Sequence, residues 1–183
     1  MKKHVFSSMM LLFSIWSPKA FSQQDFVLAS ADLGEFFSLD QVYDKFDCGG
    51  RNISPELHWA NAPAGTKSFA ITMFDPDAPT GKGWWHWLVF DIPLDISALP
   101  AGAGSVNPQY LPLPAIQSIN DYKEYGYGGP CPPPGKPHRY FITVYALDVY
   151  RLGLDKDTPP EVVYKQIMKH TIENAEIMSL YGR

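Results

Sequence analysis

The 183-residue sequence has only two cysteines, no excess of basic side chains, and none of the common catalytic motifs. Its 15 Lys and Arg face 19 Asp and Glu, a net charge of −4. Nucleic acids and anionic bilayers reward clustered Lys and Arg, so neither is expected as the main partner. The GxSxG and HExxH motifs are absent, and the two cysteines form no CxxC pair. We therefore expect no cofactor, no metal site and no enzyme of those classes.

The first 22 residues have the pattern of a secretory signal peptide. Two lysines precede an apolar segment, residues 5–16, which is too short to span a bilayer comfortably. Ala20 and Ser22 stand at the −3 and −1 positions of a cleavage site, which predicts cleavage after Ser22. Loss of three lysines leaves 23–183 as a single domain with 12 basic and 19 acidic side chains, a net charge of −7. We expect the protein in the periplasm or outside the cell; an uncleaved membrane anchor is the alternative.

Cys48 and Cys131 are an even pair in a chain predicted to be exported, which favours a disulfide. The bond would close a loop of about eighty residues and stabilise the fold by about 4 kcal/mol in the chain-entropy model. Two buried free thiols are the alternative.

Short runs of aromatic and β-branched residues, separated by Pro- and Gly-containing turns, predict strands. Their spacing favours hairpins over βαβ units, so we expect a largely antiparallel sheet. The segment from 92 to 137 holds ten of the 17 prolines and is interpreted as ordered loops over the sheet. The predicted strands are 26–30, 68–74, 85–92 and 139–148.

One helix is predicted near the C-terminus. Pro159 and Pro160 suit its first turn, after a cap at Asp157 or Thr158. An apolar stripe at helical spacing runs from Val163 through Ile167 and Thr171 toward Ile177. We expect this stripe to pack on the core.

Residues 75–87, DPDAPTGKGWWHW, join two of the predicted strands through a turn stiffened by two prolines. A hairpin here would bring Asp75 at the end of one strand close to His86 in the next. A carboxylate beside an imidazole fixes the tautomer of the ring, and a second N–H would then be free to donate to an anionic oxygen. The alternative is that Asp75 caps its own turn and His86 is structural.

Strict alternation along the second strand predicts which side chains accompany His86. It places Leu88 and Phe90 on the face of His86, and the tryptophans on either side of His86 on the opposite face.

Residues 127–140, YGGPCPPPGKPHRY, contain a second candidate cluster. Gly128 and Gly129 allow backbone N–H groups to approach a ligand closely. His138 and Arg139 open a strand, and because neighbours on a strand face opposite sides, only one of them can enter a given pocket. The alternative is a histidine in the core and an arginine in a surface ion pair.

Taken together, the motifs SPELHW (54–59), DPDAP followed by HW (75–87) and HRYFITVYALD (138–148) resemble those of the phosphatidylethanolamine-binding protein (PEBP) family, in its bacterial and archaeal YbhB/YbcL-type branch. The resemblance runs from about Phe26 to the C-terminal helix. It implies a mainly β, PEBP-like fold with a large antiparallel sheet packed on a smaller sheet, peripheral helices, a cis Ala78–Pro79 bond and a homodimer. It also implies a small pocket for phosphate-like anions or phospholipid head groups. The implied ligand-binding residues are Asp75, Trp84, His86, Gly129, His138 and Tyr140.

The leading hypothesis is therefore an exported binding module for a small anion, with a protein partner whose activity it modulates. The alternative is an inhibitor of a protease or kinase that acts through surface loops 100–136, since the resembling family includes inhibitors. A third hypothesis, a hydrolase built on Asp75, Asp77, His86 and His138, is the weakest because the usual motifs are missing.

Overall fold

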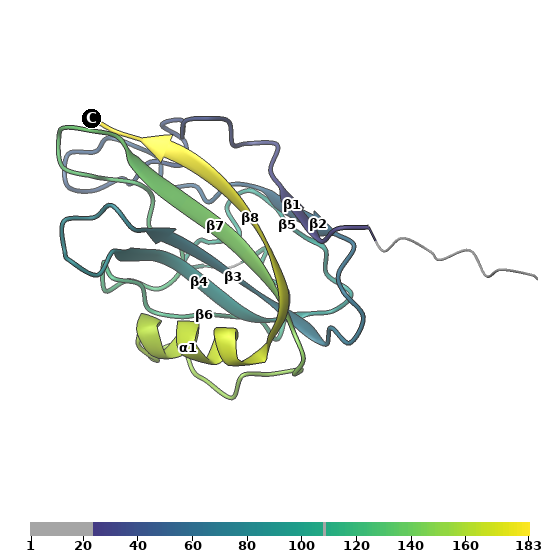
Figure 1. Ribbon diagram of the computed structural model, residues 1–183. Helices are drawn as coiled ribbons and strands as arrows, with labels where there is room; N and C mark the ends of the chain where they lie inside the picture. The colour runs from purple at the N-terminus through teal and green to yellow at the C-terminus, as the bar shows by residue number, and fades with distance from the viewer. Residues whose placement is uncertain (1–23, 108) are drawn as a thin grey trace, which may run out of the picture.

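The computed structural model describes residues 24–107 and 109–183, so the predicted signal segment and its cleavage site lie outside the described residues. Within the described ranges, no helix is long and apolar enough to cross a bilayer. The described chain forms two antiparallel sheets and one α-helix (Figure 1), which confirms the predicted fold class.

The larger sheet has five strands in the order β6-β4-β3-β7-β8. Its three central strands are β3 (Ser68–Asp75), β4 (Trp84–Pro93) and β7 (His138–Leu147), and β6 (Ile116–Gln117) and β8 (Thr171–Tyr181) form the edges. The three central strands match predicted segments. They are apolar on both sides and almost fully buried, because both faces of the sheet are covered.

The smaller sheet has the order β1-β2-β5, with β1 at Val27–Ala29, β2 at Leu57–Ala60 and β5 at Ala98–Leu99. It packs against one face of the larger sheet. Phe69 of β3 stacks on Phe26 with ring centroids 6.2 Å apart and meets the edge of Trp59 at 5.4 Å. Aromatic contacts of this kind add to the area buried between the sheets. The main core therefore lies between the two sheets.

Helix α1 (Pro160–His170) covers the other face of the larger sheet, where Val163 and Ile167 are fully buried. The prediction of a helix with proline in its first turn is confirmed. The extension of its apolar stripe beyond His170 was wrong, because Thr171 begins strand β8 (Figure 1). This segment pairs along most of its length with β7, and those inter-strand bonds outweigh its helical spacing.

Strand β4 contains a bulge at His86. Met73 and Phe74 are neighbours on β3, yet their partners on β4 are Trp87 and Trp85, so His86 has no partner. A bulge adds one residue to one strand and shifts the alternation of side chains beyond it. The predicted faces are therefore wrong: Trp85 packs under α1 with Leu88 and Phe90, and Trp87 joins the core between the sheets.

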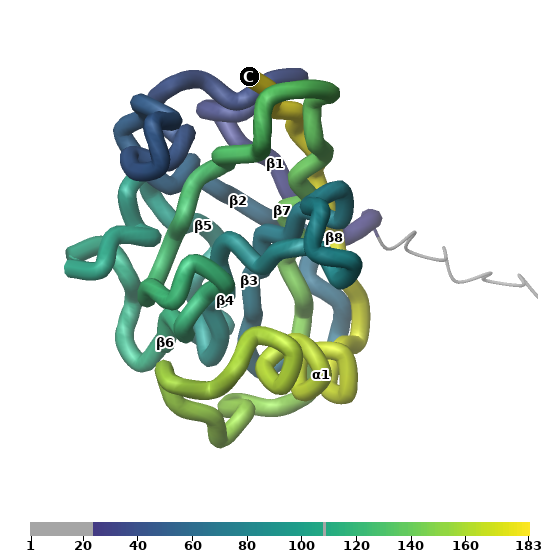
Figure 2. Tube along the Cα trace, turned by 90° about the vertical axis from the view of Figure 1, so that its left-hand side faces the viewer, coloured from purple at the N-terminus to yellow at the C-terminus, as the bar shows by residue number. Residues whose placement is uncertain are grey.

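The proline-rich segment 92–137 is ordered, as predicted, and contains β5 and β6. Its last part runs beside the loop that carries Cys48 (Figure 2). The predicted disulfide is present: Cys48 and Cys131 are bonded, with their Cα atoms 5.8 Å apart and a sequence separation of 83. This bond ties the loop after β6 to the loop between β1 and β2.

Candidate ligand-binding site

A pocket of about 360 Å³ opens where β3 ends and where β4 and β7 begin. Because neighbouring strands of this sheet are antiparallel, the end of β3 and the starts of β4 and β7 lie at the same end of the sheet. Residues distant in sequence therefore converge there. Five of the six predicted ligand-binding residues line it: Asp75, Trp84, His86, His138 and Tyr140. The remaining lining residues are Phe46, Ala78, Pro79, Thr80, Asp121, Tyr122, Cys131, Pro132 and Pro133.

Asp75 orients His138, and not His86 as predicted. Its Oδ2 atom lies 2.8 Å from Nδ1 of His138, and its Oδ1 accepts the backbone N–H of Asp77 at 2.8 Å. The hairpin prediction took only β3 and β4 into account. However, β7 lies on the other side of β3, and His138 at its start reaches the carboxylate first.

Arg139 points away from the pocket, as expected if only one residue of the pair enters it. Its guanidinium donates to both carboxylate oxygens of Asp77, at 2.7 and 2.9 Å. This bidentate pair holds the pKa of Asp77 well below its usual value, chiefly through the hydrogen bonds from Arg139. Asp77 therefore stabilises the turn outside the pocket and does not line it.

The Nδ1 atom of His86 lies 2.7 Å from the carbonyl oxygen of Gly128. A carbonyl only accepts, so Nδ1 carries the proton. Burial lowers the pKa of His86 to about 4, an effect that the Gly128 carbonyl and the Asp75 charge offset only in part. His86 is therefore neutral at pH 7 with a bare Nε2, which accepts hydrogen bonds. The predicted second N–H donor is not present in this tautomer.

Two buried donors in the wall of the pocket have no partner among the described residues: the hydroxyl of Tyr140 and Nε1 of Trp84. Tyr140 is fully buried, and burial raises its pKa well above the usual value near 10, so its hydroxyl keeps its proton. The ring of Tyr140 packs near both histidines, with its centroid 5.2 Å from that of His86 and 6.5 Å from that of His138. A buried unpartnered hydroxyl costs about 1–3 kcal/mol, which a ligand oxygen can recover.

Gly129 does not line the pocket, so its predicted role as an anion donor is wrong. Its N–H donates to Oδ1 of Asn52 at 2.7 Å, and the N–H of Gly128 donates to the carbonyl of His86 at 2.9 Å. A side chain at Gly129 would overlap the backbone of Gln41 and Tyr43. The glycine pattern thus reflects close packing of two loops rather than approach to a ligand.

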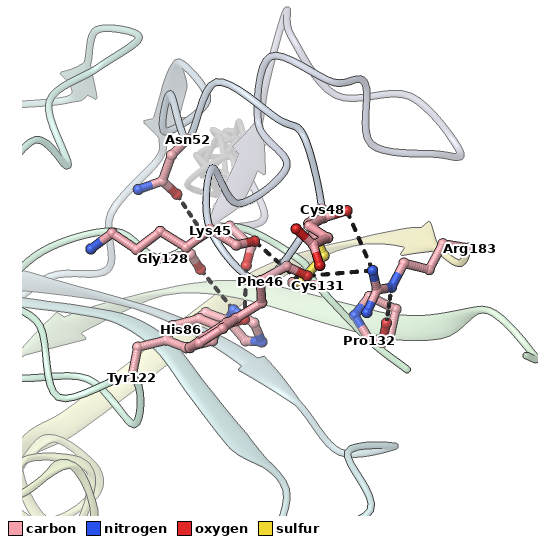
Figure 3. The surroundings of a disulfide bond; sticks show 12 residues. Lys45, Phe46, Cys48, Asn52, His86, Tyr122, Gly128, Cys131, Pro132 and Arg183 are labelled. Atoms are coloured by element: carbon pink, nitrogen blue, oxygen red, sulfur yellow. Dashed lines mark hydrogen bonds between the residues drawn. A yellow bond between two sulfur atoms is a disulfide. The ribbon is translucent and has the colours of Figure 1, made fainter. Parts of the chain in front are cut away.

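Two aromatic side chains that were not predicted as ligand-binding residues, Tyr122 and Phe46, complete the wall. Tyr122 donates to the carbonyl of Gly129 at 3.1 Å, and its ring meets the edges of Trp84 and His86. Phe46 lies in the pocket wall between the disulfide and Tyr122 (Figure 3). The predicted disulfide was the available signal for Phe46, because it attaches that loop to a segment expected to build the site.

Ala78 and Pro79 also line the pocket, but the expected cis bond between them is not found. Among the described residues the cis X-Pro bond is Leu113–Pro114.

Among the described residues, the pocket wall contains two carboxylates and two histidines but no Lys or Arg. Asp121 accepts the backbone N–H of Trp85 at 2.8 Å, so both wall carboxylates are already hydrogen-bonded. In the described ranges, no group of three His, Cys, Asp or Glu is arranged to hold a metal ion. The site is thus suited to a ligand that both accepts hydrogen bonds, from Tyr140 and Trp84, and donates one, to His86.

Comparison with known proteins gives consistent matches over most of the chain. A family model described as phosphatidylethanolamine-binding protein matches residues 30–182. The chain is 44% identical over 149 residues to the UPF0098 protein YbcL of Escherichia coli strain K12, covering 81% of each chain. It is 41% identical over 157 residues to YbhB of the same strain, covering 85% of this chain and 99% of YbhB. The crystal structure of E. coli YbcL matches with a TM-score of 0.85 at 41% identity, covering 87% of this chain and 99% of that one.

Proposed function

The chain belongs to the phosphatidylethanolamine-binding protein family, and from this premise we propose that its pocket binds a small phosphate-like anion or a phospholipid head group. The family description names a binding protein and not an enzyme, and we propose the same for this chain: the pocket holds its ligand without converting it.

The unpartnered hydroxyl of Tyr140 is the observation that carries this proposal. Tyr140 is fully buried and lines the pocket, its hydroxyl has no partner in the described chain, and its ring packs near both His86 and His138. An anionic oxygen bound there would accept a charge-assisted hydrogen bond, which is stronger than one between neutral groups. A tyrosine that served only the core would be expected to have a protein partner.

His86 makes the proposed binding dependent on a proton of the ligand, because its neutral ring accepts a hydrogen bond at Nε2. Each Nδ1 is engaged, His86 with Gly128 and His138 with Asp75, so each ring has its Nε2 for the ligand. A neutral imidazole accepts at Nε2, whereas a charged one donates there. A phosphate monoester that keeps one proton can satisfy the neutral ring, and a fully ionised one requires the ring to become charged. In either case the complex holds one proton more than a fully ionised phosphate and a neutral ring would hold together.

Isothermal titration calorimetry with inorganic phosphate and phosphoethanolamine would test this function. We expect His86→Ala and His138→Ala each to weaken binding about tenfold to a hundredfold, from the loss of about 1.5–3 kcal/mol per hydrogen bond to a charged group. Asp75→Asn should weaken binding less, since the amide can still contact Nδ1 of His138. Affinity should rise as the pH falls from 8 to 6, because the fraction of phosphate that keeps a proton for Nε2 of neutral His86 increases.

Exposed His58 provides the matched control, and His58→Ala should bind as the wild type does. If both pocket-histidine variants keep wild-type affinity, the proposed site is wrong. Release of inorganic phosphate from a phosphomonoester would instead favour a hydrolase.

A second function, inhibition of a protease or kinase through loops 100–136, is supported by one observation. Three large apolar side chains of this segment are exposed in close succession: Val106, Tyr110 and Leu113, the last at 90%. Exposed apolar residues grouped in this way are typical of protein interaction sites. Loss of inhibition or of partner capture in a Val106→Ser, Leu113→Ser variant with unchanged phosphate affinity would support this function.

We further propose export through the signal segment 1–22 to the periplasm, and association as a homodimer. The charge pattern of the segment and the disulfide between Cys48 and Cys131 support export, because disulfides persist in oxidising compartments. The mass of the secreted protein, from mass spectrometry and light scattering, tests cleavage after Ser22 and dimerisation together.

A further inference from the structure

The groups proposed to hold the anion occupy only part of the pocket. A phosphate ion has five non-hydrogen atoms, whereas a pocket of about 360 Å³ lies in the range of about 300–1,000 Å³ found for sites that hold larger small molecules. The rest of the wall includes an apolar rim made of Phe46, Cys131, Pro132 and Pro133. Space and surface thus remain for a substituent carried by the phosphate.

Phe46 is the aromatic residue of this rim, and 67% of it is exposed to solvent. Its ring packs at a tilt against Tyr43, with centroids 5.7 Å apart, and against Tyr122 at 6.2 Å. Figure 3 shows it between the disulfide and the side chains of Tyr122 and His86. An aromatic ring in this position can contact whatever extends outward from the histidines.

The backbone at Phe46 is held in an uncommon conformation. Phe46 has a φ of 54° and Asp47 a φ of 57°, a left-handed region that side chains other than glycine seldom adopt. Such residues persist only where the surrounding structure enforces them. Here the next residue is Cys48, whose disulfide fixes it to Cys131.

Arg183 reinforces the same junction. Its Nε donates to the carbonyl of Pro132 at 2.8 Å, and one terminal nitrogen lies 3.5 Å from the carbonyls of Phe46 and Asp47 (Figure 3). The two loops of the rim are therefore joined by one covalent bond and one shared guanidinium.

Building on the anion-binding function proposed above, we propose that Phe46 determines specificity by contacting an apolar or aromatic substituent on the bound phosphate. The Cys48–Cys131 disulfide holds Phe46 in that position. A dithiol reductant breaks the bond: the two sulfurs take up two electrons and two protons, and the dithiol is oxidised to a disulfide. The loop can then relax from its left-handed backbone and carry Phe46 away from the pocket.

Calorimetry with inorganic phosphate and phenyl phosphate distinguishes the contribution of the rim to affinity from that of the anion-binding groups. The wild type should bind phenyl phosphate more tightly than phosphate. Phe46→Ala should lower the affinity for phenyl phosphate about twofold to tenfold more than it lowers the affinity for phosphate, the range expected for one aromatic contact. Phe36→Ala is the matched control, since Phe36 is also exposed, at 54%, and does not line the pocket. It should change neither affinity.

Reduction with dithiothreitol should reproduce the Phe46→Ala result in the wild type and have no further effect in that variant, with circular dichroism confirming a folded protein. A wild-type affinity for phenyl phosphate in Phe46→Ala would overturn the role of Phe46. Unfolding on reduction would overturn the local role of the disulfide. If phosphate binds but the rim changes have no effect, only this inference fails, whereas a wild type that binds neither ligand refutes the proposed function as well.

Discussion

Tyr140 and Tyr145 lie on opposite faces of β7, and each lines a hollow in the surface of the five-stranded sheet. The hollow on the helix side, about 280 Å³, includes Tyr145, whose hydroxyl lies 3.3 Å from that of Thr72. Nearby, Thr143 donates to Glu176 at 2.8 Å. In the other pocket the hydroxyl of Tyr140 has no partner among the described residues.

Size does not distinguish the two hollows well, but hydrogen bonding does. Polar groups that bond one another stabilise the fold and leave little for a ligand. Unpartnered buried groups cost stability in the free protein, so their presence beside two histidines supports the proposed binding site. The same strands thus contribute to a hydrophobic core on both faces, and on the Tyr140 face their ends also line the proposed binding site. Three changes test this difference.

Removal of the disulfide on the pocket face should change the free energy of unfolding more than the other two changes do. Replacing both Cys48 and Cys131 by alanine should lower the free energy of unfolding by about 4 kcal/mol, since the disulfide restricts a long loop of the unfolded chain. Urea denaturation measures the change. In the native protein neither cysteine should react with a thiol reagent before reduction, and labelling of both would contradict the cross-link.

Acid should destabilise the pocket face through His86. Its pKa is about 4 in the folded protein against about 6.5 in the unfolded chain, so the unfolded state binds more protons between these values. The contribution of neutral His86 is therefore fully present above about pH 6.5 and is lost as the pH falls toward 4, a change on the order of 3 kcal/mol.

Urea denaturation at pH 7 and pH 4.5 would measure this loss. His86→Asn keeps a donor for the Gly128 carbonyl but does not titrate, so its stability should fall less than that of the wild type over the same interval. Equal losses in both proteins would assign the acid sensitivity to other groups.

The two tyrosines provide the smallest and most direct test. Tyr145→Phe should cost about 1 kcal/mol of stability, from the lost hydrogen bond with Thr72, and leave phosphate affinity unchanged. Tyr140→Phe should leave stability unchanged or slightly raised, because it removes a buried unpartnered hydroxyl, and should weaken phosphate binding. A stability loss in Tyr140→Phe equal to that in Tyr145→Phe would mean that both hydroxyls serve the core.

The sequence by itself determined the central strands, the start of the helix, the disulfide pair and five of the pocket residues. These follow from local signals: apolar runs, proline at a first helical turn, an even cysteine count and the family motifs around Asp75 and His138. These signals depend on the residues within one segment or, for the cysteines, on a count over the whole chain, so they can be recognised without a fold.

Only the tertiary structure decided which partners those residues have. Asp75 pairs with His138 because β7 lies beside β3, and His86 enters the pocket because a bulge shifts the alternation of β4. Gly129 packs against another loop, and the segment after His170 becomes a strand because β7 offers it an edge. These outcomes depend on contacts between segments far apart in sequence, and the free energy of such contacts exceeds the local preferences that a single segment displays.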